Sequence, residues 1–347
     1  MQYNKLGRTD IMVSALCLGS MTWGTQNSPA EAFAQIDMAL ANGVNFIDTA
    51  EMYPVNPRSK QTQGDSERII GDWIGQQGRR SEIVLATKMS GAGFDIVREG
   101  APISPATIDL ALEASLRALK TDYIDLYQLH WPNRGSYMFR QHWDYDPSQQ
   151  DGAAVLDHMI EILEHLEKLR SAGKIRHVGL SNETAWGAMR WLSIAAAHNL
   201  PRMVSVQNEY SLLCRHFDLD MAEVAHHENI GLLAFSPLAA GLLTGKYAGD
   251  ITPAKSRRTH VADLGGRITQ NMWPALDAYL EIAARYNIPP AQMALAWALS
   301  RPFVTSLIIG ATDTDQLAHA VEAHAINLPP EAFSDISAAH RRFPMPF

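Results

Sequence analysis

Four residues of complementary chemistry lie at, or shortly after, the ends of three successive apolar runs of this 347-residue sequence. Asp48 and Tyr53 belong to the end of the first run and the turn after it, Lys88 ends the second, and His130 ends the third. Taken singly, such a residue is more often solvated or structural than catalytic. The complete set is harder to explain in that way, so the chemistry that it would support is considered first.

A phenol has a pKa near ~10 and is a poor acid at neutral pH. An ammonium group beside Tyr53 would favour the phenolate and lower that pKa. A carboxylate paired with Lys88 would keep the ammonium charged and fixed in place, and His130 could donate a hydrogen bond to a substrate oxygen. This set suits carbonyl reduction, in which a proton reaches the oxygen while hydride reaches the carbon. Side chains supply no hydride, so a nicotinamide cofactor is implied.

Eight apolar runs of strand length alternate along the chain with longer segments of helical spacing. Apolar residues throughout a run are typical of parallel strands that are buried on both faces. The runs are Ala15–Gly19, Asn45–Thr49, Ile83–Lys88, Ile124–His130, Ile175–Ser181, Met203–Gln207, Gly231–Ser236 and Ser306–Gly310.

The segments between the runs carry helix signals. Ser28 and Glu31 predict a capping box with a proline at the first helical position, and Ser104 and Thr184 are predicted N-caps of later helices. The predicted helices are Pro29–Ala41, Pro105–Leu119, Ala153–Ser171, one that contains Ser193–Asn199, Trp273–Tyr286, Gln292–Leu299 and Asp315–Ala323.

Eight strands that are each followed by a helix predict an α/β fold, the (β/α)8 TIM barrel, as a single domain over residues 1–347. An open doubly wound sheet is the alternative, but it would not need eight such regular units. Residues 1–14 are expected to form a hairpin across the bottom of the barrel. Long loops are expected at 132–151, after the fourth strand, and at 238–272, after the seventh; loops of this length usually carry function.

Composition and failed motifs exclude several classes. With 29 Lys+Arg against 37 Asp+Glu and no basic stripe, the sequence does not predict a nucleic-acid binder. It shows no membrane-length apolar run and no secretory signal, and two cysteines fit a reducing compartment, so a cytoplasmic monomer or homo-oligomer is expected. No G-x-G-x-x-G follows a strand, Gly241–Tyr247 is too short for a phosphate-binding P-loop, and His226-His227-Glu228 has no metal-ligand spacing.

The remaining strand ends are polar as well. Ser181-Asn182 and Gln207 could bind a carboxamide, although simple capping of the next helices explains them too. Phe235 could stack on a flat ring or pack at the rim. A helix that starts just after Gly310 would offer a phosphate site at its N-terminus.

Several of these segments resemble the aldo-keto reductases. The resemblance begins with Asn-Phe-Ile-Asp-Thr-Ala-Glu-Met-Tyr at 45–53 and continues in Leu-Ala-Thr-Lys (85–88), Leu-Tyr-Gln-Leu-His-Trp-Pro (126–132), Gly-Leu-Ser-Asn (179–182), Val-Gln-Asn-Glu-Tyr (206–210), Phe-Ser-Pro-Leu (235–238) and Leu-Leu-Thr-Gly-Lys-Tyr (242–247). It extends from about Tyr3 to the C-terminal helix. Within the family, the chain is most similar to bacterial Tas-type reductases and to the branch of potassium-channel β subunits.

The resemblance implies a barrel that binds NADP(H) without a Rossmann domain and reduces a small-molecule carbonyl, with no metal. Tyr53 would be the general acid/base, Lys88 and Asp48 would tune it, and His130 would orient the carbonyl. Further residues are implied as cofactor contacts. They are Thr22 and Trp23 beside the nicotinamide, Ser181, Asn182 and Gln207 at its carboxamide, Phe235 on the ring, Ser236, Leu238, Gly241 and Lys246 along the pyrophosphate, and Arg257, Gly310, Thr312 and Gln316 near the adenosine 2′-phosphate.

One departure concerns the adenine end, where His319-Ala320 replaces the Glu-Asn that is usual in the related branch. Two other functions remain open from the sequence. The chain could be an NADPH-binding regulatory subunit with little turnover, or a barrel enzyme that uses Lys88 as a Schiff-base nucleophile. Asp48 beside Lys88 would hold the amine protonated, which disfavours the second of these.

Overall fold

The predicted apolar runs form a closed parallel barrel in the computed structural model, which describes residues 1–347. The strands are β3 (Leu16–Gly19), β4 (Phe46–Asp48), β5 (Val84–Met89), β6 (Ile124–Leu129), β7 (Ile175–Ser181), β8 (Met203–Glu209), β9 (Gly231–Phe235) and β10 (Val304–Ile309). They pair in the order β10-β3-β4-β5-β6-β7-β8-β9, and β10 returns to β3. The (β/α)8 barrel is therefore confirmed, and closure excludes the open sheet.

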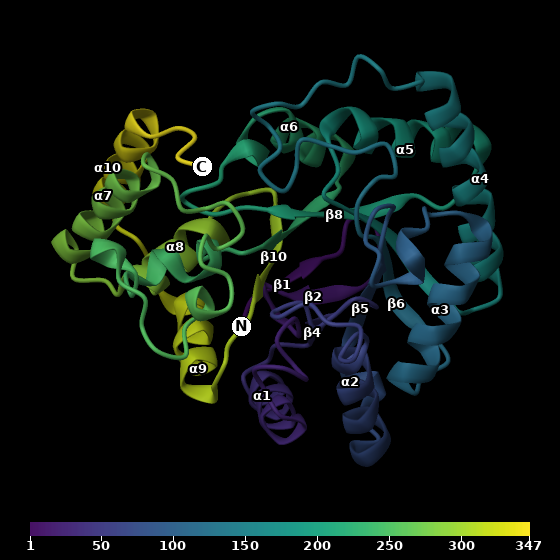
Figure 1. The fold of residues 1–347 in the computed structure, drawn as a ribbon, viewed down its shortest axis with the longest axis horizontal. Helices are drawn as coiled ribbons and strands as arrows, with labels where there is room; N and C mark the ends of the chain where they lie inside the picture. Colours follow the sequence, from purple (N-terminus) through teal and green to yellow (C-terminus); the bar gives the residue numbers. More distant parts are fainter.

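Helices surround this barrel (Figure 1). They are α1 (Pro29–Ala41), α2 (Asp65–Gln77), α3 (Pro105–Leu119), α4 (Gly152–Ser171), α5 (Ala185–His198), α6 (Asp220–Glu228), α7 (Met272–Arg285), α8 (Pro290–Leu299), α9 (Thr314–Glu322) and α10 (Pro330–Arg342). All seven predicted helices are present. No bounds were predicted for α2, α6 and α10, and none of the three has a side-chain N-cap that would mark its start.

The predicted caps explain where three of the helices begin. Ser28 accepts a hydrogen bond from the backbone N–H of Glu31, whose carboxylate accepts one from the N–H of Ser28 at 2.7 Å. Ser104 and Thr184 each accept from the backbone N–H three residues later. These bonds satisfy N–H groups that the first turn of a helix leaves without partners.

The N-terminal hairpin consists of β1 (Tyr3–Lys5) and β2 (Met12–Ser14), which pair antiparallel as expected. Leu6 and Val13 are fully buried, and they pack on inward-facing barrel residues such as Cys17 and Phe46. The hairpin thereby closes one end of the barrel with apolar side chains. Its position leaves the other end, where the strands terminate, for the site.

Two long loops lie at that other end. Loop A (residues 132–151) joins β6 to α4 without regular secondary structure. Loop B (residues 238–271) joins β9 to α7 and contains the 3-10 turns η4 (Ala239–Thr244), η5 (Ala248–Asp250) and η6 (Arg257–Thr259). Both loops were predicted at these positions.

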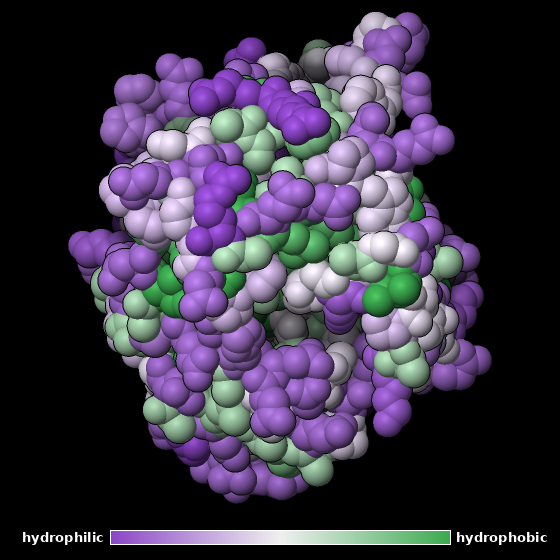
Figure 2. Space-filling view, turned by 90° about the vertical axis from the view of Figure 1, so that its left-hand side faces the viewer, coloured by the Kyte–Doolittle hydropathy of each residue, from purple (hydrophilic) through white to green (hydrophobic).

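The main core fills the layer between the barrel and the helices, where 75 buried residues form one cluster. On the face formed by α7, α9 and α10, hydrophilic residues surround hydrophobic patches that lie across its middle (Figure 2). None of the helices is both long enough and apolar enough to cross a membrane.

Close packing between α2 and α3 leads to a first prediction. A Cβ added to Gly71 would lie 2.0 Å from the carbonyl oxygen of Ala118, a rigid backbone atom. We expect Gly71→Ala to force the two helices apart and to lower the free energy of unfolding by roughly 1–3 kcal/mol, measured by urea denaturation. Gly75→Ala in the same helix is the matched control, since its Cβ would meet nothing closer than Lys120 Cδ at 3.5 Å. That change should be neutral or stabilising by up to about 1 kcal/mol, and an equal effect at both positions would contradict the prediction.

Candidate active site

A buried ion pair between neighbouring strands is at the centre of the site. Asp48 ends β4 and Lys88 lies in β5, so the barrel places their side chains side by side. Lys88 Nζ lies 2.7 Å from Asp48 Oδ2 and donates to the carbonyl oxygen of Thr49 at 2.6 Å. Burial acts to lower the pKa of Lys88, but the charge of Asp48 and the hydrogen-bonding partners Asp48 and Tyr53 outweigh it and leave the pKa above its usual value. A protonated amine held in this way is a poor nucleophile, which argues against the Schiff-base alternative.

Two glutamines hold the other oxygen of Asp48. Gln207 Nε2, from β8, donates to Asp48 Oδ1 at 2.8 Å, and Gln128 Nε2, from β6, donates at 3.2 Å. Gln207 Nε2 also lies 3.2 Å from Gln128 Oε1. The amide nitrogen of Gln207 is therefore already engaged. Gln128 was not predicted as a site residue, although it lies two residues before His130, on the same face of the strand.

The turn after β4 positions Tyr53. Its backbone N–H donates to the carbonyl of Ala50 at 3.0 Å, and its own carbonyl accepts from Gly64 at 2.9 Å. Lys88 Nζ lies 4.8 Å from the centroid of the Tyr53 ring. Burial raises the pKa of Tyr53 above that of a free phenol, whereas Lys88 lowers it. The expected acidification is wrong as a net effect, because burial outweighs the ammonium, and the phenol stays protonated at neutral pH.

His130 faces Tyr53, with 5.9 Å between the ring centroids and 77° between the ring planes. Burial first, and the charge of Lys88 second, hold the pKa of His130 well below its usual value. The imidazole is therefore neutral, and its buried Nδ1 has no partner. The Trp131 ring lies beside it, tilted by 48° with 4.9 Å between the ring centroids, and its indole N–H donates to the carbonyl of Ala92 at 3.0 Å.

Three predicted carboxamide ligands lie together next to His130. Asn182 Nδ2 donates to the carbonyl of His130 at 2.9 Å and to Ser181 Oγ at 3.1 Å, and Ser181 Oγ donates to the carbonyl of Gln207 at 2.8 Å. Asn182 Oδ1 is buried without a partner. An unpaired buried acceptor is costly, and a ligand N–H would satisfy it.

The predicted contacts after β3 divide into two environments. Thr22 is half-buried and donates from Oγ1 to Asn27 at 2.8 Å. Trp23 is fully buried in the layer between barrel and helices, where its indole N–H donates to Gln35 of α1 at 3.1 Å. The indole is therefore enclosed between barrel and helix, and the expected place of Trp23 beside a nicotinamide stays a prediction.

The predicted pyrophosphate contacts lie at the end of β9 and the start of loop B. Phe235, Ser236 and Leu238 are half-buried, and Lys246 is exposed. Gly241 has a φ of 95°, and a Cβ there would lie 3.2 Å from Lys246 Nζ. Glycine therefore permits both the left-handed turn and the close approach of the ammonium. An ammonium beside an open backbone turn suits a phosphate group.

The predicted contacts for the adenosine end come from two segments of the chain. Thr312 and Gln316 hydrogen-bond to each other at 3.0 Å, and Asp313 caps α9 beside them, close to exposed Gly310 in the chain. Arg257 approaches from loop B. Its Nη2 lies 2.9 Å from the side-chain oxygen of Asn56 when the Asn56 amide is turned to accept.

Arg257 thus lies on the side of the mouth near Tyr53. Burial and the neighbouring Arg267 lower its pKa to about 10. Asn56 is also bonded by Gln26, which is next to Asn27, and Asn27 donates to the carbonyl of Thr312 at 2.8 Å. The implied place of Arg257 near the adenosine 2′-phosphate stays a prediction.

Comparisons with known proteins agree with the resemblance. A profile of the Aldo/keto reductase family matches residues 15–341. "Protein tas" of Escherichia coli (strain K12) is 42% identical over 349 residues, which cover 100% of this chain and 99% of that protein. "Uncharacterized oxidoreductase YrpG" of Bacillus subtilis (strain 168) is 34% identical over 95% of this chain and 93% of its own length. A "Probable voltage-gated potassium channel subunit beta" of Oryza sativa subsp. japonica is 31% identical over 97% and 96%.

Behind Lys88, a buried carboxyl leads to a second prediction. Glu67 of α2 accepts from Thr87 Oγ1 at 2.6 Å, and burial raises its pKa to about 7 from a model-peptide value of 4.5. Because the folded chain holds this proton more tightly than the unfolded chain, stability should fall as the pH rises from about 4.5 to about 7. The free energy of unfolding of the protein relative to that of Glu67→Gln should drop by about 3 kcal/mol over this range.

Urea denaturation at several pH values checks this. Glu82→Gln is the control with the opposite sign, because Arg79 lowers the pKa of Glu82. Its effect should grow as the pH rises. A pH-independent difference between the protein and Glu67→Gln would show that Glu67 is ionised in the folded state.

Proposed function

This chain belongs to the aldo/keto reductase family, and on that premise we propose that it is an NADPH-dependent reductase of aldehydes and ketones. The observation that supports the proposal is the arrangement of a protonated phenol, a charged ammonium and a neutral imidazole around one point. Lys88 lies 4.8 Å from the Tyr53 ring, and His130 faces the same ring at 5.9 Å.

The residues present fit a nicotinamide dinucleotide. Unpaired Asn182 Oδ1 would accept from the carboxamide, next to Ser181 and to the free oxygen of the Gln207 amide. Gly241 and Lys246 would hold the phosphates. When bound, the reduced nicotinamide supplies the hydride for the substrate carbon.

In the proposed reaction, His130 donates a hydrogen bond to the carbonyl oxygen and orients it. Tyr53 then gives its phenolic proton to that oxygen as negative charge develops there. Lys88 stabilises the phenolate that remains, and Asp48 keeps Lys88 charged and in position. The raised pKa of Tyr53 means that the acid is protonated before each turnover.

A second candidate function follows from the relatives that are named as potassium-channel β subunits. On that reading the chain would bind the nucleotide tightly, turn over slowly and act through a partner protein. The complete set of Asp48, Tyr53, Lys88 and His130 favours the reductase, because a binding module has no use for a proton donor. Turnover separates the two: a stoichiometric protein partner together with negligible NADPH consumption would support the subunit.

Replacement of the proposed acid gives the third prediction. Tyr53→Phe should lower kcat for aromatic aldehydes by roughly 10²–10⁴-fold, since it removes the proton donor and leaves the ring in place. NADPH absorbance measures turnover, and fluorescence titration should show that NADPH binding is retained. Tyr279→Phe is the control, because Tyr279 is a buried tyrosine of α7, outside the site. Unchanged turnover in Tyr53→Phe, or no turnover by the protein itself, would overturn the proposal.

Cofactor binding gives the fourth prediction. Lys246→Met should weaken NADPH binding by about tenfold, the loss expected for one charge-assisted contact to phosphate. Lys255→Met, a second exposed lysine of loop B, should leave the affinity unchanged. Fluorescence titration with NADPH and NADH tests both the contact and the preference between the two cofactors. Equal effects of the two lysine variants would place the phosphates elsewhere.

A further inference from the structure

Loops A and B share one buried carboxylate, that of Glu209. We propose that Glu209 is a positioning residue that couples the loop beside the substrate to the loop over the cofactor, so that neither can open without the other. The inference rests on the proposed function, since it assigns the loops to the two ligands of that reaction.

Glu209 is the last residue of β8, and its side chain is only 10% exposed. Its Oε2 accepts from Arg140 Nη1 of loop A at 2.7 Å. Its Oε1 accepts from Arg267 Nε of loop B at 2.8 Å. A rigid strand end therefore presents one carboxylate oxygen to each loop.

The two loops also touch directly at this point. Gly265 and Gly266 of loop B lie against the Arg140 side chain of loop A, and a Cβ on Gly266 would come within 3.3 Å of Arg140 Cδ. Both glycines have positive φ angles, 70° and 82°, which residues with a Cβ rarely adopt. Loop B thus uses glycine where it crosses the arginine of loop A.

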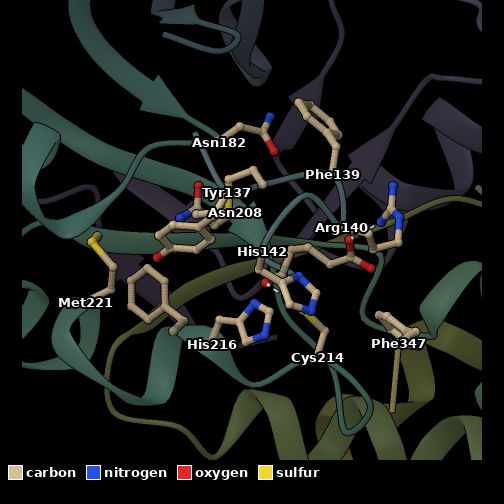
Figure 3. Close-up of a pocket in the computed structure, with 13 residues that line it drawn as sticks. Tyr137, Phe139, Arg140, His142, Asn182, Asn208, Cys214, His216, Met221 and Phe347 are labelled. Atoms are coloured by element: carbon tan, nitrogen blue, oxygen red, sulfur yellow. Dashed lines mark hydrogen bonds and ion pairs between the residues drawn. The ribbon is translucent and has the colours of Figure 1, made fainter. Parts of the chain in front are cut away.

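The segment 343–347 meets both loops beside this contact. Thr269 of loop B donates from Oγ1 to the carbonyl of Pro346. Phe347 is buried, and together with Arg140 and His142 of loop A it lines a cavity of about 20 Å³ (Figure 3). Three segments that are far apart in the sequence therefore converge around Glu209.

The negative charge of Glu209 is essential where the two loops meet. Arg140 and Arg267 are both mostly buried, and they repel each other unless an anion lies between them. Burial, with the charge of Arg267 next, lowers the pKa of Arg140, and the charge of Glu209 opposes this. Without the negative charge of Glu209, at least one loop must move its arginine into water.

The contact between the loops at Glu209 affects both proposed ligands, the cofactor and the carbonyl substrate. Loop B carries Lys246, which would hold phosphate, and Arg257, which reaches Asn56 near Tyr53. Loop A carries Phe139, whose ring meets Trp131 at 6.2 Å, next to His130. Opening loop B to release cofactor would therefore break the bonds that hold the wall of the substrate site.

Glu183 provides a matched control within the same molecule. It also follows a strand end, is buried and pairs with an arginine, Arg134 Nη1, at 3.0 Å. That arginine belongs to loop A, and the other carboxylate contacts of Glu183 lie in α5 and its cap. Glu183 therefore fixes loop A but makes no bond to loop B.

The experiment measures cofactor release and steady-state kinetics in Glu209→Gln, Arg140→Gln, Arg267→Gln and Glu183→Gln. Stopped-flow fluorescence should show that NADPH leaves about tenfold faster in the first three, the loss of one charge-assisted hydrogen bond. The decisive variant is Arg140→Gln, which lies on loop A, away from Lys246. The KM for an aromatic aldehyde should rise in the same three variants while kcat does not fall, a split that mere loss of folded enzyme would not produce.

Hydrogen exchange without cofactor gives a readout that does not depend on activity. Glu209→Gln should speed exchange in both loops. Glu183→Gln should speed it only around Arg134, because Arg140 still ties the rest of loop A to Glu209. Release at the unaltered rate in Arg140→Gln, or accelerated release in Glu183→Gln, would overturn the coupling. If Glu209→Gln does not fold, the two arginine variants decide. If the unaltered protein binds no NADPH, the proposed function fails, and exchange in the two loops still tests the junction.

Discussion

The structure depends on a charged amine held inside a barrel. Moving an ammonium ion from water into a protein interior is expensive, and an ion pair compensates only if its remaining hydrogen-bonding groups are also satisfied. Here Lys88 bonds Asp48 and a backbone carbonyl, while Gln128 and Gln207 donate to the second oxygen of Asp48. Only a closed barrel can do this, because Asp48 is on β4 and Gln207 reaches it across the interior from β8.

That single cation also influences the protonation of its neighbours. It opposes the effect of burial on Tyr53 and adds to the effect of burial on His130. The result is a protonated phenol next to a neutral imidazole. A solvated lysine at this place would do neither, because water would screen its charge. Fold and chemistry are therefore linked through the burial of one side chain.

The sequence predicts the barrel and the central residues because both follow from periodicity. Asp48, Lys88 and His130 end consecutive apolar runs, and strand ends meet at one rim in any parallel barrel. To predict Gln128 as a site residue, one must know how β6 and β8 are aligned across the barrel, and a single sequence does not give that alignment. The surroundings of Trp23 and Arg257 cannot be predicted in this way, because each lies on an irregular segment whose path depends on tertiary contacts.

The direction of the pKa shift of Tyr53 could not be predicted from the sequence either. Pairing of a tyrosine with a lysine can be inferred from the sequence, but the extent of burial cannot, and burial sets the sign of the shift. The start of a helix can be equally hard to predict. Neither α2 nor α6 begins with a capping side chain that would mark its first residue in the sequence.

At the rim of the barrel, as at its centre, buried carboxylates pair with cationic side chains. Loops that leave strand ends have no ladder of backbone hydrogen bonds to fix them, so side chains must do so. Glu51, Glu183 and Glu209 each follow or end a strand and pair with an arginine from a neighbouring loop. Because a buried carboxylate binds an arginine in a defined geometry, each pair fixes a loop at one point. Only Glu209 has arginines from both long loops, and so only there does the geometry of one ligand's loop depend on that of the other.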